Sequence, residues 1–288
     1  MEKNGFQRIL LASDGSRQAE AAVSAAASLA LASGGRVRAV HVWSLEVHES
    51  QGAWDVELFG EADSLIEKTV TRLWSLGVKA DGAISRADHR HVGSAIAEEA
   101  RRFEADLVVV GSRGLSDWQS LLHHSVSHEL LGTLDCPVLV VRSQEAPAVH
   151  RAQKVLLAIA GGDDIVPAVG AAVAAASARG SRVVVLHVAL AVTSFQGFAY
   201  VETDDEIEGT VDRVVKLLTD AGIPYETVVA EPAPVAEVVA EMAAAIQADV
   251  IVIGSSRMGD LTSMLFGSVT HQLLRATTKP VLVAERVR

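Results

Sequence analysis

The sequence predicts an α/β protein made of two doubly wound domains, each with a five-stranded parallel sheet. Three observations favour this fold. Several sequence blocks recur in the same order in the two halves of the chain, which indicates a duplicated unit. The apolar runs are continuous rather than alternating, as in parallel strands covered by helices on both faces. Aromatic residues make up only 4% of the 288-residue chain while alanine and valine predominate, which suits helices packed closely on a buried sheet.

The duplication defines the predicted domains. The matched blocks are RILLASDGS at 8–16 with KVLLAIAGG at 154–162, VRAVHV at 37–42 with VVVLHV at 183–188, ADLVVVGS at 105–112 with ADVIVIGS at 248–255, and CPVLVVR at 136–142 with KPVLVAE at 279–285. We therefore predict one domain at 1–143, a linker at 144–152 and a second domain at 153–288. Each has about the length of an ordinary single domain.

Each half alternates short apolar runs with longer alanine-rich or amphipathic segments, which predict strands and helices respectively. In the first half the predicted strands lie near 8–13, 36–43, 79–85, 106–111 and 137–142. The predicted helices of that half lie near 17–33, 55–76, 92–103 and 125–133. The predicted strands of the second half lie near 153–159, 181–188, 225–230, 249–254 and 280–285.

The last strand of each half is expected to lie at the edge of its sheet. Pro137 and Pro280 stand at the first position of these strands, where a residue without an N–H is tolerated. The strands that follow them are apolar on both faces, and a bare apolar edge tends to pair with another strand. We predict that the two domains pair edge to edge through these strands as an intramolecular pseudo-dimer, and a further homodimer is an open alternative.

Composition excludes several classes of partner. The formal net charge is −11 and the acidic excess is shared by both halves, so neither half has the basic surface that nucleic acid or anionic lipid requires. The single cysteine, Cys136, fits a reducing compartment. No signal-peptide pattern and no run of roughly 18–20 apolar residues is present, so we expect a cytoplasmic protein with no membrane partner.

Candidate binding residues follow the first two strands of each half, since ligands of open parallel sheets bind beyond the carboxyl ends of the strands. Ala12-Ser13-Asp14 ends the first strand, and Asp14 could accept hydrogen bonds from a ribose hydroxyl or an adenine amine. It could equally form an Asx turn or cap the next helix. The second strands end in His41-Val42 and His187-Val188, whose histidines we interpret as buried core residues rather than ligands.

A glycine-rich loop follows the fourth strand of the first half. Gly111-Ser112-Arg113-Gly114 allows the backbone to turn sharply and to approach a ligand closely. A helix starting at Ser125-Val126-Ser127 would present free N–H groups and hydroxyls to an anion. The alternative is purely structural, with glycines that end a strand and a serine that caps a helix.

These motifs together resemble the universal stress proteins. The resemblance rests on ASDGS after the first strand, HV at the end of the second, ADLVVVGSRGL, a G-x-x-G-x9-G-S/T loop and CPVLVV, and it covers nearly the whole chain twice. It implies a Rossmann-like fold, a stress-response role and dimerisation through the last strand. In the ATP-binding members the glycine loop binds the phosphates, and the first-strand Asp and second-strand Val bind the adenosine. The residues so implied here are Ala12, Ser13, Asp14, Val42, Gly111, Arg113, Gly114, His124, Ser125, Val126 and Ser127.

Each half departs from the family pattern. His124 stands where the first loop requires a third glycine, which adds bulk near a phosphate, although a protonated imidazole could bond a phosphate oxygen. In the second half Ala160 replaces Asp14 and Arg257 replaces the second glycine, so ATP or another adenine nucleotide is expected mainly in the first domain. The candidate residues of the second domain are Val188, Gly254, Arg257, Gly267, Ser268, Val269 and Thr270.

Metal binding and catalysis are weighed against nucleotide binding. His124 and His128 share a helix face but have no evident third ligand, so we predict no metal site. The segment AGGDD at 160–164 resembles the SGGxDS loop of ATP-pyrophosphatases, yet its aspartates are expected to cap a helix. We see no nucleophile with a positioned base, so any ATPase activity should be weak. The leading hypothesis is a nucleotide-dependent regulator, and the alternatives are an interaction or scaffold module that has lost nucleotide binding and a nucleotide-using enzyme.

Overall fold

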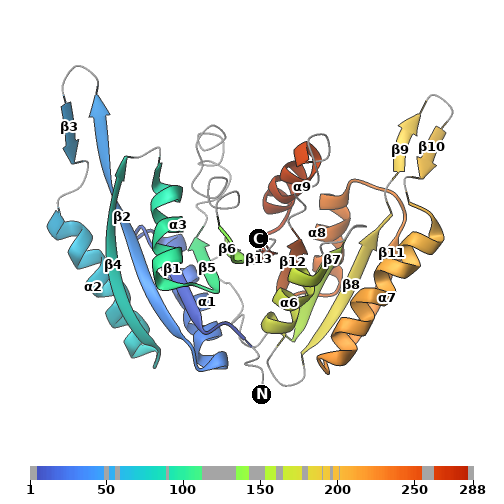
Figure 1. The fold of residues 1–288 in the computed structure, drawn as a ribbon, viewed down its shortest axis with the longest axis horizontal. Coiled ribbons are helices and arrows are strands. Elements are labelled where there is room, and N and C mark those ends of the chain that lie inside the picture. The colour runs from blue at the N-terminus through green and yellow to red at the C-terminus, as the bar shows by residue number, and fades with distance from the viewer. Residues whose placement is uncertain are drawn as a thin grey trace. The chain divides into compact units, whose positions relative to one another are not determined.

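The chain folds into two compact units, Met1–Ala148 and Val149–Arg288 (Figure 1). The computed structural model describes residues 5–48, 52–55, 59–88, 91–111, 134–142, 153–159, 165–176, 181–189, 191–194, 197–200, 202–254 and 263–284. Each unit contains a largely parallel sheet with helices on both faces, so the predicted two-domain α/β fold class is confirmed. The predicted linker at 144–152 lies outside the described residues.

The first unit has the parallel strand order β4-β2-β1-β5-β6, with β3 antiparallel to the end of β2. The chain first builds the sheet from β1 towards β4 and then returns to add β5 on the other side of β1. The strand order therefore reverses between β1 and β5. Its elements are β1 (Arg8–Ala12), α1 (Arg17–Ser33), β2 (Arg36–His48), β3 (Gly52–Asp55), α2 (Phe59–Ser75), β4 (Lys79–Asp88), α3 (Val92–Phe103), β5 (Leu107–Gly111) and β6 (Val138–Val141).

The second unit repeats this topology, with the parallel order β11-β8-β7-β12-β13. An additional antiparallel hairpin, β9-β10, follows β8. Its elements are β7 (Lys154–Ile159), α6 (Ile165–Ala175), β8 (Arg182–Val188), β9 (Ala191–Ser194), β10 (Gly197–Tyr200), α7 (Asp204–Asp220), β11 (Tyr225–Ala230), α8 (Val235–Ala245), β12 (Val250–Gly254), α9 (Ser263–Ala276) and β13 (Val281–Ala284).

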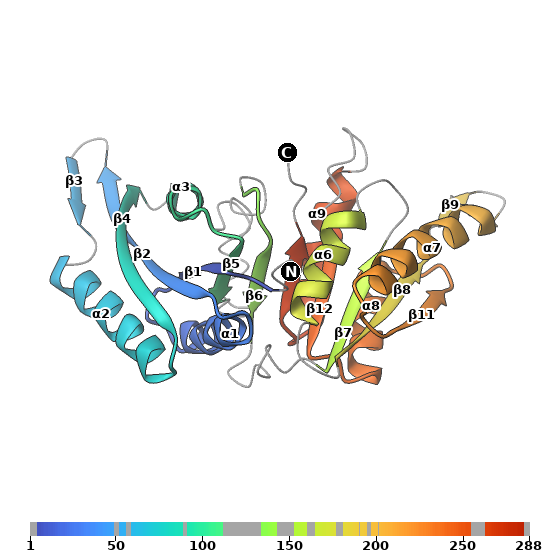
Figure 2. The same cartoon turned by 60° about the horizontal axis from the view of Figure 1, so that its bottom comes forward.

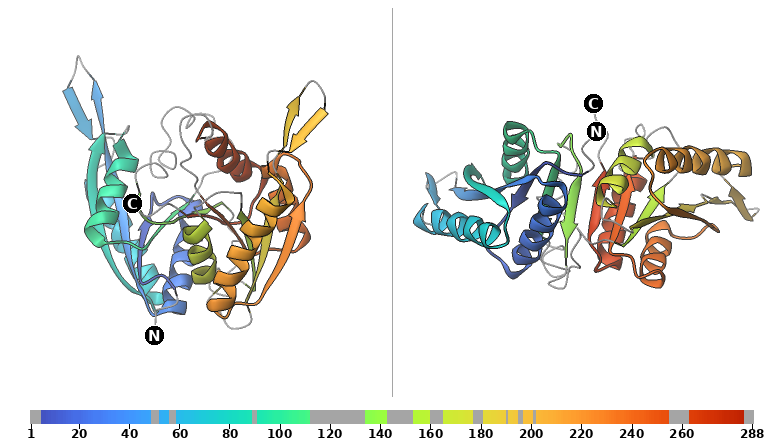
Figure 3. Two further views of the ribbon diagram at one scale, coloured as in Figure 1. Left: turned by 45° about the vertical axis from the view of Figure 1, so that its right-hand side comes forward. Right: turned by 90° about the horizontal axis from the view of Figure 1, so that it is seen from below.

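Helices cover both faces of each sheet. In the first unit α1 and α2 lie on one face and α3 on the other, and in the second unit α6 and α7 lie opposite α8 and α9 (Figures 2 and 3). The first four residues of β5 and of β12 are buried accordingly. Continuous apolar runs are therefore buried on both faces, as the sequence predicts. The pairing of the two domains through β6 and β13 stays a prediction.

Three short strands were not predicted from the sequence. β2 continues to His48, five residues beyond its predicted end. β3 pairs antiparallel with the end of β2 and ends at Asp55, where the second helix was expected to begin. The helix itself begins at Phe59. The hairpin β9-β10 follows β8 in the same way. β3 extends the edge of the first sheet antiparallel to the end of β2, and β9 and β10 form a separate two-stranded sheet.

A carboxylate at the start of β5 ties this strand to β1. Asp106 accepts backbone hydrogen bonds from Gln7 N at 2.7 Å and Arg8 N at 2.9 Å. Burial raises the pKa of Asp106, and these hydrogen bonds oppose the shift by stabilising the charged form. Asp249 accepts bonds in the same way from the backbone at the start of β7. The aspartate of the repeated AD pair therefore has a structural role in both units.

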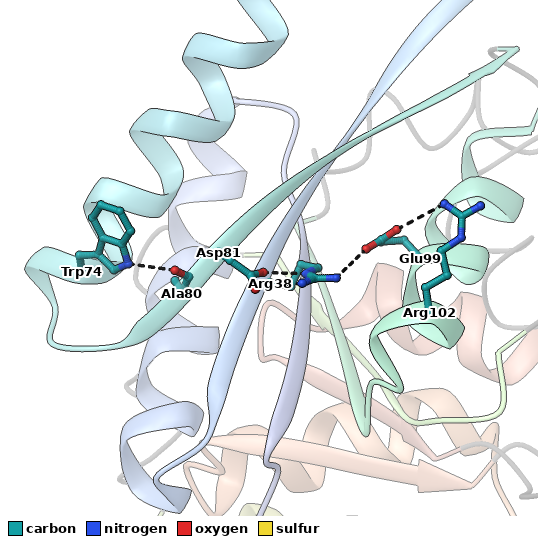
Figure 4. A network of polar contacts seen from close by, with 6 residues as sticks. All are labelled: Arg38, Trp74, Ala80, Asp81, Glu99 and Arg102. Carbon is teal, nitrogen blue, oxygen red and sulfur yellow. Dashed lines mark hydrogen bonds and ion pairs between the residues drawn. The ribbon is translucent and has the colours of Figure 1, made fainter.

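A polar network fixes α3 over the sheet of the first unit (Figure 4). Arg38 on β2 donates to both carboxylate oxygens of Asp81 on β4, at 2.6 and 2.9 Å, and to Oε1 of Glu99 at 3.2 Å. Glu99 is only 6% exposed, and Arg102 lies 3.9 Å from its second oxygen. The two carboxylates raise the pKa of Arg38, chiefly through the hydrogen bonds to Asp81. Arg38 is thus the main counter-charge of a buried glutamate.

Gly82 on β4 lets α2 approach the sheet closely. A Cβ at this position would overlap Cγ2 of Ile66 and lie 3.2 Å from Cγ2 of Val70, both on α2. Gly82→Ala should therefore lower the free energy of unfolding by about 1–3 kcal/mol through overpacking. Gly60→Ala in α2 is the matched control, because a Cβ at this position would have no neighbouring atom within 4 Å. Urea denaturation checks this, and equal stability of the two variants would contradict the close approach.

Candidate functional site

The carboxyl ends of β1 and β5 meet beside the middle of β2 at one edge of the first sheet, next to the point where the strand order reverses. Ala12 pairs with Val40 of β2 on one side and with Val110 of β5 on the other. Gly111 then ends β5. Ligands of open α/β sheets bind at such a switch point. The fold therefore brings the first three candidate segments, around Ala12, Val42 and Gly111, to one edge.

The turn from β1 to α1 has a defined hydrogen-bond pattern. Ser13 is buried and donates its N–H to the carbonyl oxygen of Val40 at 3.0 Å. Asp14 is exposed, and its Oδ1 accepts the N–H of Ser16 at 3.0 Å in an Asx turn. Ser16 in turn caps α1 by accepting from Ala19 N. One oxygen of Asp14 therefore maintains the turn while the side chain remains accessible at the sheet edge.

Gly15 makes this turn possible. Its φ is +72°, a left-handed conformation that residues with a Cβ adopt only under strain. A Cβ there would also lie 2.8 Å from Cδ1 of Leu65. The sequence signal for this residue is the Asp-Gly pair itself, which is typical of tight turns.

His41 holds the end of β1 in place. Its side chain is 8% exposed, and Nδ1 lies 2.9 Å from the carbonyl oxygen of Ser13. Because a carbonyl oxygen only accepts, Nδ1 carries the proton in this contact. The interpretation of His41 as a buried, hydrogen-bonded residue agrees with the structure, and its position makes it a support of the Ser13-Asp14 turn.

The matching histidine of the second unit has a different partner. His187 is fully buried, and its Nε2 lies 3.1 Å from Oε2 of Glu202, which precedes α7. Ile159 stands where the first unit has Ser13. The described residues provide no hydrogen-bond partner for His187 Nδ1. The histidine therefore ties β8 to the start of α7 through Glu202, a contact that no local sequence motif indicates.

The candidate residues of the second unit lie at the ends of β8 and β12 and within α9. Val188 is buried at the end of β8 and Gly254 ends β12. α9 begins at Ser263 and already includes the four residues from Gly267 to Thr270. N–H groups beyond the first helical turn bond to preceding carbonyl oxygens, so those of Gly267, Ser268, Val269 and Thr270 are not available to a phosphate.

The remaining candidate residues lie outside the part of the chain that the structure describes. These are Arg113, Gly114, His124, Ser125, Val126, Ser127 and Arg257, together with Ala160 and His128. Apart from Gly111, the described part of the first site is thus the part to which the family resemblance assigns adenosine. Within the described ranges no three His, Cys, Asp or Glu side chains are grouped as metal ligands. No helix in those ranges is long and apolar enough to cross a membrane.

Replacing His41 should destabilise the first unit. His41→Leu leaves the buried carbonyl of Ser13 without its donor, so we expect a loss of about 1–3 kcal/mol in the free energy of unfolding. His41→Asn should recover part of this loss, because an amide N–H can donate from a similar position. His91→Leu is the control, since His91 is exposed and makes no capping bond through its side chain. If urea denaturation shows the same loss in the free energy of unfolding for His91→Leu as for His41→Leu, the supporting role of His41 is contradicted.

Comparison with known proteins gives a consistent result. The model of the universal stress protein family matches residues 5–142 and again residues 151–285. A universal stress protein of Mycobacterium tuberculosis is 31% identical over 189 residues, which cover 64% of this chain and 63% of that protein. The match thus covers less than two thirds of the length of the mycobacterial relatives.

A solved structure that aligns with nearly the whole chain shows the same fold. A universal stress protein from Archaeoglobus fulgidus aligns with 99% of this chain and 100% of its own, at a TM-score of 0.71 and 17% identity. A universal stress protein solved in complex with cAMP covers 48% of this chain and 97% of its own, at a TM-score of 0.39 and 22% identity. Because the family model matches both units, the chain belongs to the universal stress protein family and contains two copies of its domain.

Proposed function

We propose that the first unit binds an adenine nucleotide, with ATP as the expected ligand, and that the protein is a nucleotide-dependent regulator in the stress response. The observation that carries this proposal is the β1–α1 turn at the switch point of the first sheet. Asp14 is exposed there on a turn that His41 and Gly15 hold in shape. Its carboxylate is suited to accept a hydrogen bond from a ribose hydroxyl or an adenine amine.

The proposal is specific to the first unit because the second lacks the Asp14 carboxylate and the histidine contact that supports its turn. Ala160 has no carboxylate to offer in place of Asp14. His187 bonds to Glu202 rather than to the end of β7. The N–H groups of Gly267 and Ser268 are inside α9. Binding of one nucleotide per chain is therefore expected.

Regulation rather than catalysis fits the groups at this edge. A general base needs a side chain free to take a proton from the attacking group. Asp14 uses Oδ1 for its turn, and His41 uses Nδ1 for the carbonyl of Ser13. His41 is engaged in positioning the backbone and Asp14 is assigned to the adenosine rather than to the phosphates, so we expect any ATP hydrolysis to be slow. We also propose a cytoplasmic location, which fits the net charge of −11 and the single Cys136.

Two measurements on the purified full chain test this function. Acid denaturation should release adenine nucleotide into the supernatant, and titration of nucleotide-free protein with ATP should saturate. Gly114→Asp should abolish saturation, since it adds a negative charge to the predicted phosphate loop, while the surface control Asp205→Asn should bind as the wild type does. If neither released nucleotide nor saturable binding is found, the proposal fails and the interaction-module alternative replaces it. ATP turnover well above that of Gly114→Asp would favour an enzyme.

A further inference from the structure

The second unit has an open groove between α7 and its edge strand β11, which lie side by side in Figure 1. The groove has a volume of about 300 Å³ and is lined by Asp204, Ile207, Glu208, Val211 and Val229. Val229 is 54% exposed although it belongs to a strand. The centre of the groove is thus apolar, and two exposed carboxylates lie on its helical side.

A single difference between the repeats accounts for part of this groove. Gly82 of β4 pairs with Ala39, and Thr227 of β11 pairs with Val185, the equivalent position in the repeated second strand. Gly82 lets α2 contact its strand directly, as described above. Thr227 places a branched side chain on the face turned towards α7 and remains exposed. The helix therefore cannot approach the edge strand of the second unit as closely.

The two edge strands also differ in how they are protected. Charged residues discourage pairing with foreign strands. β4 contains four of them, Lys79, Asp81, Arg86 and Asp88, whereas β11 contains only Glu226 in the sequence YETVVA. Glu226 is further engaged in an ion pair with Arg182 at 2.9 Å. β11 is thus the less protected edge.

The hydrogen-bond pattern of β11 leaves donors pointing outwards. The carbonyl oxygens of Pro224 and Ala230 accept from β8, so even-numbered residues face that strand. In a parallel ladder the alternate residues, including Thr227 and Val229, direct their N–H and C=O groups to the open edge. β11 ends its sheet among the strands that the structure describes. An added strand would find both main-chain partners there and an apolar groove for its side chains.

We propose that β11 and the adjoining groove dock an extended segment of a partner protein that carries apolar side chains flanked by lysine or arginine. The charge of the groove identifies this occupant. Asp204 and Glu208 line it, and the first turn of α7 adds Asp205 and Glu206. A second copy of this chain would bring two such acidic surfaces together, which disfavours pairing of β11 with itself. Addition of a strand to an exposed edge gives affinity through main-chain bonds and specificity through the groove.

The test uses the full chain and a fluorescein-labelled peptide of sequence KKVTVTVKK, in which lysines flank the valines on the same face of the strand, with EEVTVTVEE as the charge control. Fluorescence anisotropy should show saturable binding of the basic peptide and no binding of the acidic one. Thr227→Pro should weaken binding at least tenfold, because it removes an outward N–H while the ladder to β8 remains. Val229→Lys should have a similar effect through repulsion, and it replaces Thr227→Pro if thermal melting shows that the proline variant unfolds.

Two charge variants complete the test. Asp204→Asn combined with Glu208→Gln should weaken binding of the basic peptide and reduce its dependence on salt. Asp212→Asn combined with Asp220→Asn removes the same charge from α7 outside the groove lining and should have little effect. The proposal would be overturned if the two double variants lost the same affinity for the basic peptide, or if Thr227→Pro and Val229→Lys bound it as the wild type does. Equal binding of the acidic and basic peptides would also overturn it. A dimer of the unliganded chain that Val229→Lys dissociates would assign the edge to a second copy instead.

Discussion

Arg38→Met is expected to lower the free energy of unfolding of the first unit by about 3–5 kcal/mol, the usual effect of removing one partner from a buried ion pair. Glu99 is the reason, because its side chain is 8% exposed and Arg38 is its nearest cation, at 3.2 Å. After the substitution only Arg102, at 3.9 Å and 64% exposed, remains close to it. The bonds to Asp81 contribute less, since that carboxylate is 48% exposed and water can replace them.

Urea denaturation of the variant is compared with two controls. Arg182→Met removes an analogous pair between neighbouring strands of the second unit, Arg182–Glu226, whose side chains are 45% and 59% exposed, so we expect a loss of less than about 1 kcal/mol. Arg38→Met combined with Glu99→Gln should be more stable than Arg38→Met alone, because no buried charge is left unpaired. Equal losses for Arg38→Met and Arg182→Met would show that burial of Glu99 has no energetic consequence.

Asp14→Asn is expected to weaken ATP binding about 10- to 100-fold, the equivalent of losing one hydrogen bond to a charged acceptor. Asparagine keeps an oxygen that can accept the N–H of Ser16, so the Asx turn should remain. Its amide group replaces the second carboxylate oxygen with a donor, which cannot accept a bond from a ribose hydroxyl or an adenine amine. The substitution therefore separates recognition of the ligand from the stability of the turn.

Isothermal titration with ATP measures this effect, and thermal melting without ATP measures the turn. The melting temperature should stay close to that of the wild type. Asp14→Ala should lower both the affinity and the melting temperature, because it also removes the acceptor for Ser16. Unchanged affinity in Asp14→Asn, with saturable binding of ATP by the wild type, would place the nucleotide away from this carboxylate.

The sequence alone predicts the architecture well because the repeat and burial act over long segments. β5 and β12 are runs such as Leu107–Val110, buried on both faces, and their apolar character follows directly from that position. The strands β3, β9 and β10 could not be predicted in this way, because they lie outside the parallel core of the two sheets, as an antiparallel edge strand and a separate hairpin. The start of α9 at Ser263 was likewise not evident from the glycine-serine pair at 267–268.

The candidate site was predictable in part for a similar reason. The Asp14-Gly15 pair indicates a turn at the end of a strand, and the fold then places it at the switch point. The contact of His187 with Glu202 has no local signal, because it depends on how a loop after β10 returns to the end of β8. The two His-Val pairs are therefore identical in sequence, although their histidines have different hydrogen-bond partners.

The stoichiometry of nucleotide binding tests the central proposal most directly. Equilibrium dialysis of the nucleotide-free full chain against labelled ATP should give one ATP per chain at saturation, and Asp14→Asn should shift the curve to higher ATP concentration without changing its end point. A saturation value of two per chain would contradict the assignment of binding to the first unit. Absence of saturable binding would contradict nucleotide recognition by this protein altogether.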